Sequence, residues 1–130
     1  MKNMEEKKMS EERRKLVILI TRGLESEVSS VAFTIANGAI TSGLDVSIFL
    51  TASAVDLVRK RAIDATQVHP LEPLSDLMQD FIKRGANLWA CTPCVKGRGY
   101  EQDDLIEGVV ISGASVMHKL IQDGAATLSF

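Results

Sequence analysis

Two cysteines and two cations stand close together in the stretch WACTPCVKGRGY, residues 89–100: Cys91, Cys94, Lys96 and Arg98. A thiol at neutral pH is mostly protonated, and nearby cations lower its pKa, so that more of the nucleophilic thiolate is present. A second cysteine can attack a disulfide or persulfide formed on the first. The spacing therefore predicts sulfur transfer or thiol exchange at this stretch.

Two glycines, Gly97 and Gly99, flank Arg98. Glycine adopts backbone angles that are closed to other residues, and such turns direct N–H groups toward an anion. We expect both glycines, with Lys96 and Arg98, to stabilise a thiolate or an anionic sulfur donor.

The elements that would position this stretch are read from the apolar pattern. The run KLVILIT is continuous and β-branched, which is typical of a strand buried on both faces of a parallel sheet. The predicted strands are 15–21, 45–51, 86–91, 108–112 and 125–130. Helical periodicity between them predicts helices over 26–42, 53–61 and 75–84 and a last one that opens at Ser112 or Ser115. Strands that alternate with helices predict an α/β fold with a parallel sheet covered on both faces.

The sequence also predicts which residues of two helices are exposed and which are buried. Arg59, Lys60 and Arg61 would close the 53–61 helix as a solvated basic end, opposite an early Asp56. The last helix would bury Met117, Leu120 and Ile121.

The carboxyl ends of the predicted strands are where ligands gather in an open parallel sheet. Arg22 follows the first strand, Thr51 and Ser53 follow the second, and Cys91 to Gly99 follow the third. We therefore expect these residues at one edge, with Arg22, Thr51 and Ser53 as a candidate anion or small-molecule pocket.

Composition narrows the function classes. The chain has 130 residues, 45% hydrophobic and 25% charged, which predicts one domain over 15–130 behind a charged tail, 1–14. The net charge of −2 gives no electrostatic case for nucleic-acid binding, and no apolar run is long enough to cross a membrane. Two adjacent cysteines favour a reducing compartment, which predicts the cytoplasm.

Rival interpretations of the cysteine pair remain. A zinc site would need His69 and His118, whose spacing matches no zinc finger, so no metal and no other cofactor is predicted. An ordinary thioredoxin is excluded, because no proline follows the pair and Ala90 separates Trp89 from it. The remaining alternative is that both cysteines are buried residues without a chemical role.

The order of these segments resembles the DsrE/DsrF-like family of sulfur-relay proteins. Cys91, Cys94, Arg98 and Gly99 match the subgroup pattern Cys-x-x-Cys-x-x-x-Arg-Gly, and the segments GLDVSIFLTASAV, DDLIEGVVISGASVMHKLI and the terminal GAATLSF are also similar. The resemblance covers about residues 15–130. It implies a three-layer α/β/α sandwich with a mainly parallel sheet of four to five strands and a homotrimer or homohexamer.

The resemblance also implies a function. Cys91 matches the position of the persulfide carrier, and Cys94 is the additional cysteine that would discharge it. The expected partners are sulfur donor and acceptor proteins or small sulfane-sulfur compounds. Two other functions stay open: a thiol–disulfide redox protein or sensor that uses the same pair, and a non-enzymatic oligomer that binds an anion or small molecule.

Overall fold

A computed structural model describes residues 13–130 of the chain as an α/β sandwich. The five predicted strands are confirmed, and they form one all-parallel sheet in the order β4-β3-β2-β1-β5. Their bounds are β1 Lys15–Ile20, β2 Asp45–Leu50, β3 Asn87–Cys91, β4 Val109–Ser112 and β5 Ala126–Ser129. Most of the charged segment predicted as a tail, residues 1–12, lies outside the described residues.

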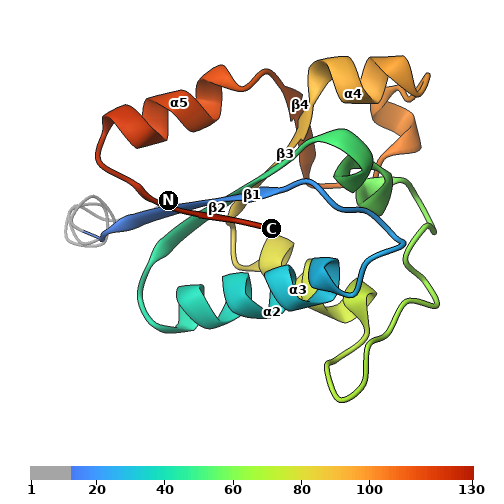
Figure 1. Ribbon diagram of the computed structural model, residues 1–130, viewed down its shortest axis with the longest axis horizontal. Helices are drawn as coiled ribbons and strands as arrows, with labels where there is room; N and C mark the ends of the chain where they lie inside the picture. The colour runs from blue at the N-terminus through green and yellow to red at the C-terminus, as the bar shows by residue number, and fades with distance from the viewer. Residues whose placement is uncertain (1–12) are drawn as a thin grey trace.

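Helices cover both faces of this sheet, which confirms the three-layer arrangement (Figure 1). On one face lie α2, Val28–Thr41, and α3, Leu74–Lys83. On the other lie α4, Thr92–Gly97, and α5, Ser115–Gln122. Within the described residues no helix is both long and apolar enough to pass through a membrane.

The core lies between the central strands and the α2–α3 layer. Ile18 and Ile48 are paired in register on β1 and β2, and both are fully buried. The rings of Phe33 on α2 and Phe81 on α3 meet edge to face, with centroids 5.9 Å apart. The continuous apolar run at β1 is thus explained by helices or loops on both sides of the central strands.

The predicted helix over 53–61 is corrected by the structure. A 3₁₀ helix, η1, spans Ala52–Val58 and stops before the basic triplet. Arg59 then adopts an extended conformation and bridges to Leu105, and the N–H of Lys60 donates to the Asp104 carbonyl at 2.9 Å. These contacts end the helix at Val58, so the three cations lie after the helix and do not form its last turn.

Two further differences lie on the α4–α5 side. The short helix α4 was not predicted, because proline at its start and two glycines at its end are typical of a loop. The face of α5 expected to be buried is only half-covered, and Ile121 is 45% exposed. The reason is that α5 packs mainly over β1 and beside β5, an edge strand that itself stays largely exposed.

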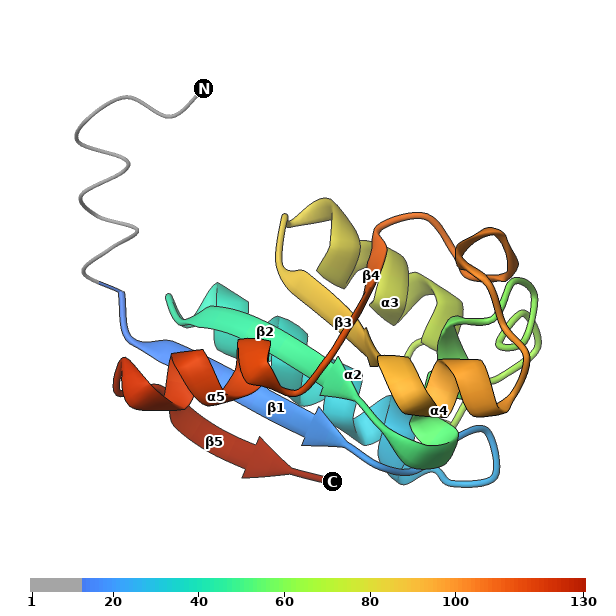
Figure 2. The same cartoon turned by 90° about the horizontal axis from the view of Figure 1, so that it is seen from above.

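The carboxyl ends of the strands point the same way, as Figure 2 shows from above. The loop after β1, the start of η1 after β2 and the start of α4 after β3 therefore converge at one edge. This parallel arrangement brings residues far apart in the sequence into one site.

Candidate functional site

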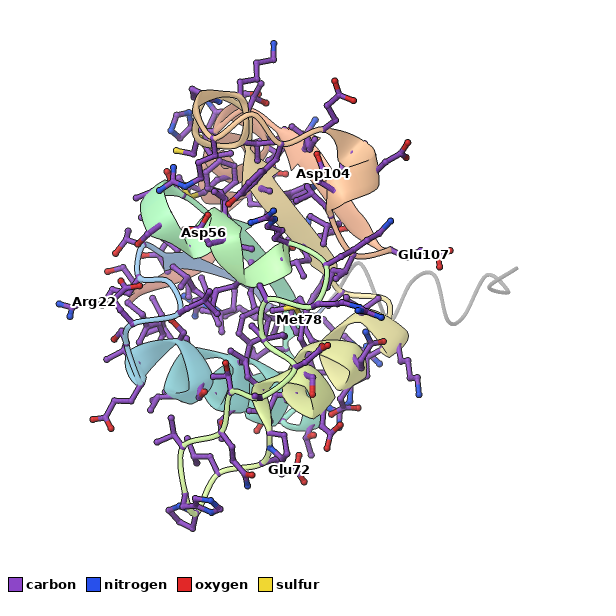
Figure 3. All side chains as sticks on the ribbon, turned by 90° about the vertical axis from the view of Figure 1, so that its right-hand side faces the viewer. Arg22, Asp56, Glu72, Met78, Asp104 and Glu107 are labelled. Carbon is purple, nitrogen blue, oxygen red and sulfur yellow. The ribbon has the colours of Figure 1, made fainter. Side chains whose placement is uncertain are left out.

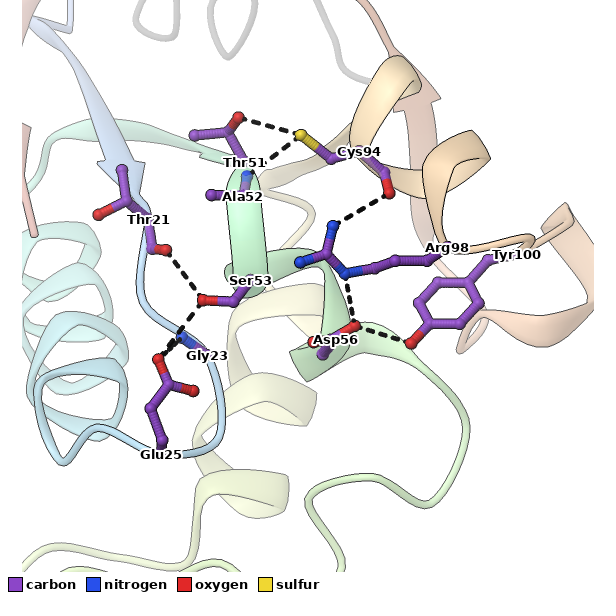
Figure 4. A network of polar contacts seen from close by, with 10 residues as sticks. All are labelled: Thr21, Gly23, Glu25, Thr51, Ala52, Ser53, Asp56, Cys94, Arg98 and Tyr100. Atoms are coloured by element: carbon purple, nitrogen blue, oxygen red, sulfur yellow. Dashed lines mark hydrogen bonds and ion pairs between the residues drawn. The ribbon is translucent and has the colours of Figure 1, made fainter.

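The Cys94 thiol lies at the centre of this edge and is held by the end of β2. The backbone N–H of Ala52 donates to Cys94 Sγ at 3.2 Å, and the Thr51 hydroxyl oxygen lies 3.5 Å from the same sulfur (Figure 4). Both partners of the sulfur come from a segment more than forty residues earlier in the chain. Cys94 as a residue is partly exposed, whereas Cys91 is buried.

These contacts favour the charged form of Cys94. The hydrogen bond with Thr51 lowers the pKa of the Cys94 thiol most, and the Ala52 N–H, the Cys91 thiol and the Arg98 charge lower it further. Partial burial acts in the opposite direction and raises the pKa, but the net change is a decrease. A lowered pKa makes Cys94 a thiolate at a lower pH than a free cysteine.

Cys91 stands in a different environment. It ends β3, precedes the first residue of α4 and is 8% exposed, packed within the hydrophobic core. The resemblance gave the carrier role to Cys91 by its distance to Arg98, whereas the local chemistry favours Cys94, which is more exposed and has a lowered pKa.

Arg98 is anchored below Cys94 by a carboxylate. Its Nε lies 3.0 Å from Oδ1 of Asp56 on η1, and its Nη1 donates to the Cys94 carbonyl oxygen at 3.3 Å. The Tyr100 hydroxyl donates to the same Asp56 oxygen at 2.7 Å. The pKa of Tyr100 is raised, because the hydrogen bond to Asp56 stabilises the neutral phenol. The triad Asp56–Arg98–Tyr100 therefore fixes the segment after α4 against η1.

The other residues expected around the thiol are placed differently. Lys96 lies two residues from Cys94 on α4, a spacing that puts side chains on different sides of a helix. It lines a shallow pocket with Tyr100 and Ile111. Gly97 is inside α4, and the N–H of Gly99, at φ +73°, donates to the Lys96 carbonyl at 2.9 Å. Gly99 thus ends the helix, and its N–H is used within the protein.

A second polar group borders the site on the β1 side. The Ser53 hydroxyl donates to the Thr21 carbonyl at 3.3 Å and to the Glu25 carboxylate at 3.4 Å. The N–H of Gly23 also donates to Glu25, at 3.2 Å. Backbone N–H groups, first its own and then that of Gly23, lower the pKa of Glu25. Ser53 is therefore engaged by the β1 loop, while Thr51 faces the thiol.

Gly23 allows the β1 loop to approach η1 closely. A Cβ atom at this position would lie 2.5 Å from the Ser53 carbonyl oxygen, closer than real Cβ contacts occur. Arg22, by contrast, extends outward from the surface in Figure 3 and does not line a pocket with Thr51 and Ser53 in the described contacts. Thr51, Ser53 and Arg22 therefore lie in three different surroundings and do not line one pocket together.

Metal ligands do not gather in the described part of the chain. Among residues 13–130 no cluster of three or more histidine, cysteine or acidic side chains is placed to hold a metal ion. His69 is exposed in the loop before Pro70, and His118 is exposed on α5. The cysteine pair thus stands without the two histidines that the zinc interpretation required.

Sequence reasoning gave no role in the site to Glu25, Asp56 or Tyr100. The closest donor to Cys94 is the backbone N–H of Ala52, which lies between Thr51 and Ser53, two residues that the sequence placed at this edge. Tyr100 directly follows the Arg-Gly pair, and as the single tyrosine of the chain it was the one available signal.

Two curated proteins are similar to this chain in sequence. Among curated proteins, the chain is 33% identical over 110 residues to the uncharacterized protein MJ0989 of Methanocaldococcus jannaschii, covering 82% of this chain and 89% of that protein. It is also 33% identical over 99 residues to the uncharacterized protein MK0008 of Methanopyrus kandleri, covering 76% of this chain and 74% of that protein.

Solved structures share the fold. The ychN protein from E. coli matches with a TM-score of 0.74 at 18% identity, covering 91% of this chain and 99% of that one. MTH1491, a protein of unknown function from Methanobacterium thermoautotrophicum, matches with a TM-score of 0.69 at 20% identity, covering 90% and 99%. Residues 14–130 match the DsrE/DsrF-like family over nearly the whole described chain. The chain therefore belongs to the DsrE/DsrF-like family.

Proposed function

We propose that the protein is a sulfur carrier that binds sulfane sulfur as a persulfide on Cys94 and passes it to an acceptor thiol. One observation carries the proposal: Cys94 Sγ receives the Ala52 N–H at 3.2 Å in a residue that is partly exposed. A thiolate stabilised by fixed donors in a partly exposed position is the usual arrangement of a reactive cysteine. The subgroup pattern of Cys91, Cys94, Arg98 and Gly99 supports the same chemistry.

The sulfur transfer balances without a redox partner. The Cys94 thiolate attacks the outer sulfur of a donor persulfide, RS–SH. The donor S–S bond breaks, its electron pair leaves with RS⁻, and Cys94–S–SH forms. An acceptor thiolate then attacks the outer sulfur, which restores the Cys94 thiolate. The transferred sulfur keeps its oxidation state throughout.

The neighbouring residues have distinct roles in this scheme. Ala52 and Thr51 hold the negative charge of Cys94 before attack and after release. Arg98 adds a positive charge, and Asp56 and Tyr100 act as positioning residues for it. Cys91, buried behind Cys94, supplies a thiol that helps to lower the Cys94 pKa.

Intact mass spectrometry after treatment with inorganic polysulfide tests this assignment. Wild type and Cys91→Ser are expected to gain one sulfur atom that reductant removes, and Cys94→Ser is expected to gain none. An adduct that requires Cys91 and not Cys94 would return the carrier role to Cys91. Absence of an adduct from all three proteins would end the carrier proposal.

A thiol–disulfide redox protein is the second candidate, and the proximity of two free cysteines favours it. The Cys91 thiol contributes to the lowered pKa of Cys94, so the two sulfurs are near enough to interact. Titration against glutathione redox buffers would discriminate, because a redox protein forms the disulfide reversibly. A pair that stays reduced in every buffer removes this candidate.

We also propose that the chain assembles as a homotrimer or homohexamer. Large apolar side chains stay exposed on β4, α5 and β5, where Val110 is 55%, Ile121 45% and Leu128 42% exposed. Burial of such side chains between copies is a common way to cover them. Light scattering coupled to size exclusion tests this, and a monomeric mass at high concentration would contradict it.

A further inference from the structure

A basic pocket lies beside the Cys94 site and is not used by the chemistry above. Its volume is about 440 Å³, which falls within the usual range of small-molecule sites, roughly 300–1,000 Å³. Three consecutive cations line it, Arg59, Lys60 and Arg61, together with Asp56 and Tyr100. We call this cavity the basic pocket.

The cations of the basic pocket are not neutralised by the described protein. Within residues 13–130, ion pairs join Arg84 to Asp80 and Arg98 to Asp56, and neither pair includes residues 59–61. Asp56 is the one carboxylate that lines the pocket, and it already accepts from Arg98 and from the Tyr100 hydroxyl. The pocket is therefore suited to a negatively charged ligand.

The cations are also held in place. The Arg59 guanidinium lies over the Tyr100 ring, 5.4 Å from its centroid, in a cation–π contact. The N–H of Lys60 is bound to the Asp104 carbonyl. Arg61 has φ +68°, a left-handed conformation that costs a non-glycine residue about 1 kcal/mol. A strained backbone at a charged residue is the kind of outlier that points to a binding role.

A short chain of contacts connects the basic pocket to the backbone of Cys94. Asp56 forms part of the pocket wall, its Oδ1 binds Arg98, and Arg98 binds the Cys94 carbonyl. In Figure 4 the Arg98 side chain lies between Cys94 and the pair Asp56 and Tyr100. A ligand in the pocket is thus separated from the Cys94 turn by one arginine side chain.

We infer that the basic pocket binds the anionic end of a low-molecular-weight persulfide, whose carboxylates or phosphates meet Arg59, Lys60 and Arg61 while its sulfur reaches Cys94. This inference rests on the proposed function and names its donor class. The transfer is the step given above: Cys94 Sγ bonds to the outer sulfur, and the electron pair of the broken S–S bond leaves with the donor thiolate. The anionic end stays in the pocket and lowers the entropy cost of attack.

The test compares two donors that share the persulfide and the peptide backbone and differ in whether the carboxylates are charged. One is glutathione persulfide, with its two carboxylates, and the other is its diethyl ester, in which both are masked. The rate of sulfur addition to the protein is followed by intact mass in wild type, Lys60→Ala and Arg61→Gly. Glycine suits the left-handed backbone at position 61, so this variant removes the charge without disturbing the fold. Lys119→Ala, an exposed cation on α5, is the matched control.

The expected result is that wild type reacts about tenfold faster with the free acid than with the ester, since a charged hydrogen bond contributes roughly that factor. Lys60→Ala and Arg61→Gly should lose most of this preference, and Lys119→Ala should keep it. The preference should also shrink as salt is added. Equal rates with both donors in wild type, or an unchanged preference in both pocket variants, would overturn the inference and leave the carrier function intact.

Two further arms keep the inference separate from the proposed function. Coenzyme A persulfide replaces the carboxylates with phosphates, and the donor whose rate falls more in Arg61→Gly identifies the preferred anion. S-Methylglutathione cannot donate sulfur, and its binding is followed by the amide NMR shifts of residues 59–62. If no donor adds sulfur to wild type, the carrier function fails, and saturable shifts that Arg61→Gly abolishes would still support an anion pocket. Absence of such shifts as well would overturn the pocket.

Discussion

The backbone N–H of Ala52 lies 3.2 Å from Cys94 Sγ, and Ala52 itself adopts φ +52°. A left-handed conformation is unfavourable for alanine by about 1 kcal/mol, because its Cβ crowds the following carbonyl. The conformation turns the N–H at the beginning of η1 toward the sulfur. The strained residue and the reactive thiol are therefore two parts of one arrangement, and a backbone donor of this kind does not titrate.

The reactivity of Cys94 should extend to lower pH than that of a free cysteine. The rate of alkylation by iodoacetamide, followed by mass spectrometry in Cys91→Ser, is expected to rise with pH with a midpoint below that of a free cysteine. Thr51→Val removes the strongest cause of the lowered pKa and should move the profile to higher pH. An identical profile in Thr51→Val would contradict the role of that hydroxyl.

The same lowered pKa has a consequence for stability. A thiolate favoured by the fold contributes fully above the unfolded pKa, about 8.5, and this contribution is lost as pH falls through the folded pKa. Wild type should therefore gain free energy of unfolding relative to Cys94→Ser as pH rises toward that value. Urea unfolding of both proteins at several pH values measures the difference. A constant difference across that window would argue against a stabilised thiolate.

Replacement of Ala52 by glycine should stabilise the fold. Glycine adopts positive φ without steric cost, so the free energy of unfolding is expected to rise by up to about 1 kcal/mol. The N–H is retained, so the pH profile of Cys94 alkylation should stay near that of wild type. Thermal denaturation provides the measurement. A clear loss of stability would show that the alanine backbone is not strained.

The two cations beside the cysteines should differ in their effect. Arg98→Ala is expected to raise the pKa of Cys94, because Arg98 contributes a favourable charge. It should also lower stability by about 1 kcal/mol through loss of the contact with Asp56. Lys96→Ala, on another side of α4, is the matched control and should leave the alkylation profile unchanged. Equal shifts in the two variants would place Lys96 at the thiol as well.

Tyr100 offers a direct optical test of the Asp56 network. It is the only tyrosine in the chain, so ultraviolet titration reports it alone. The hydrogen bond to Asp56 raises its pKa, and Asp56→Asn should bring the pKa back down. The associated stability is present below the unfolded tyrosine pKa, about 10, and is lost as pH rises through the folded value. An unshifted titration in Asp56→Asn would place Asp56 away from the phenol.

Gly23 and Gly38 form a matched pair of substitutions. Gly23→Ala would bring a Cβ atom against the Ser53 carbonyl and should destabilise the fold by about 2 kcal/mol. It should also slow Cys94 alkylation, because Ser53 is adjacent to Ala52. Gly38 lies on the exposed side of α2 with no atom within 4 Å of an added Cβ. Gly38→Ala should therefore stabilise by about 0.5–1 kcal/mol. Equal effects in the two variants would mean that the loop does not approach η1 closely.

The strands and the layer order could be predicted from sequence because a strand buried on both faces has a recognisable apolar run. The run at 15–21 is apolar without alternation, and it forms the central strand β1, which pairs with β2. Helix α4 has no recognisable helical pattern in the sequence, because it is short, begins near a proline and ends at glycines. Helix η1 was predicted too long, because the tertiary contacts of Arg59 and Lys60, and not local preference, end it.

The order of residues alone places two thiols, an arginine and two glycines at the end of a central strand, which is enough to expect sulfur chemistry at the carboxyl edge of a parallel sheet. The different surroundings of the two thiols become visible only in the folded chain. Cys94 is distinguished from Cys91 by the Ala52 N–H and the Thr51 hydroxyl, which come from the end of the neighbouring strand β2. The physical reason is that the pKa of a thiol depends on the donors and charges within a few ångströms, and those neighbours are assembled by the sheet and not by the order of residues along the chain.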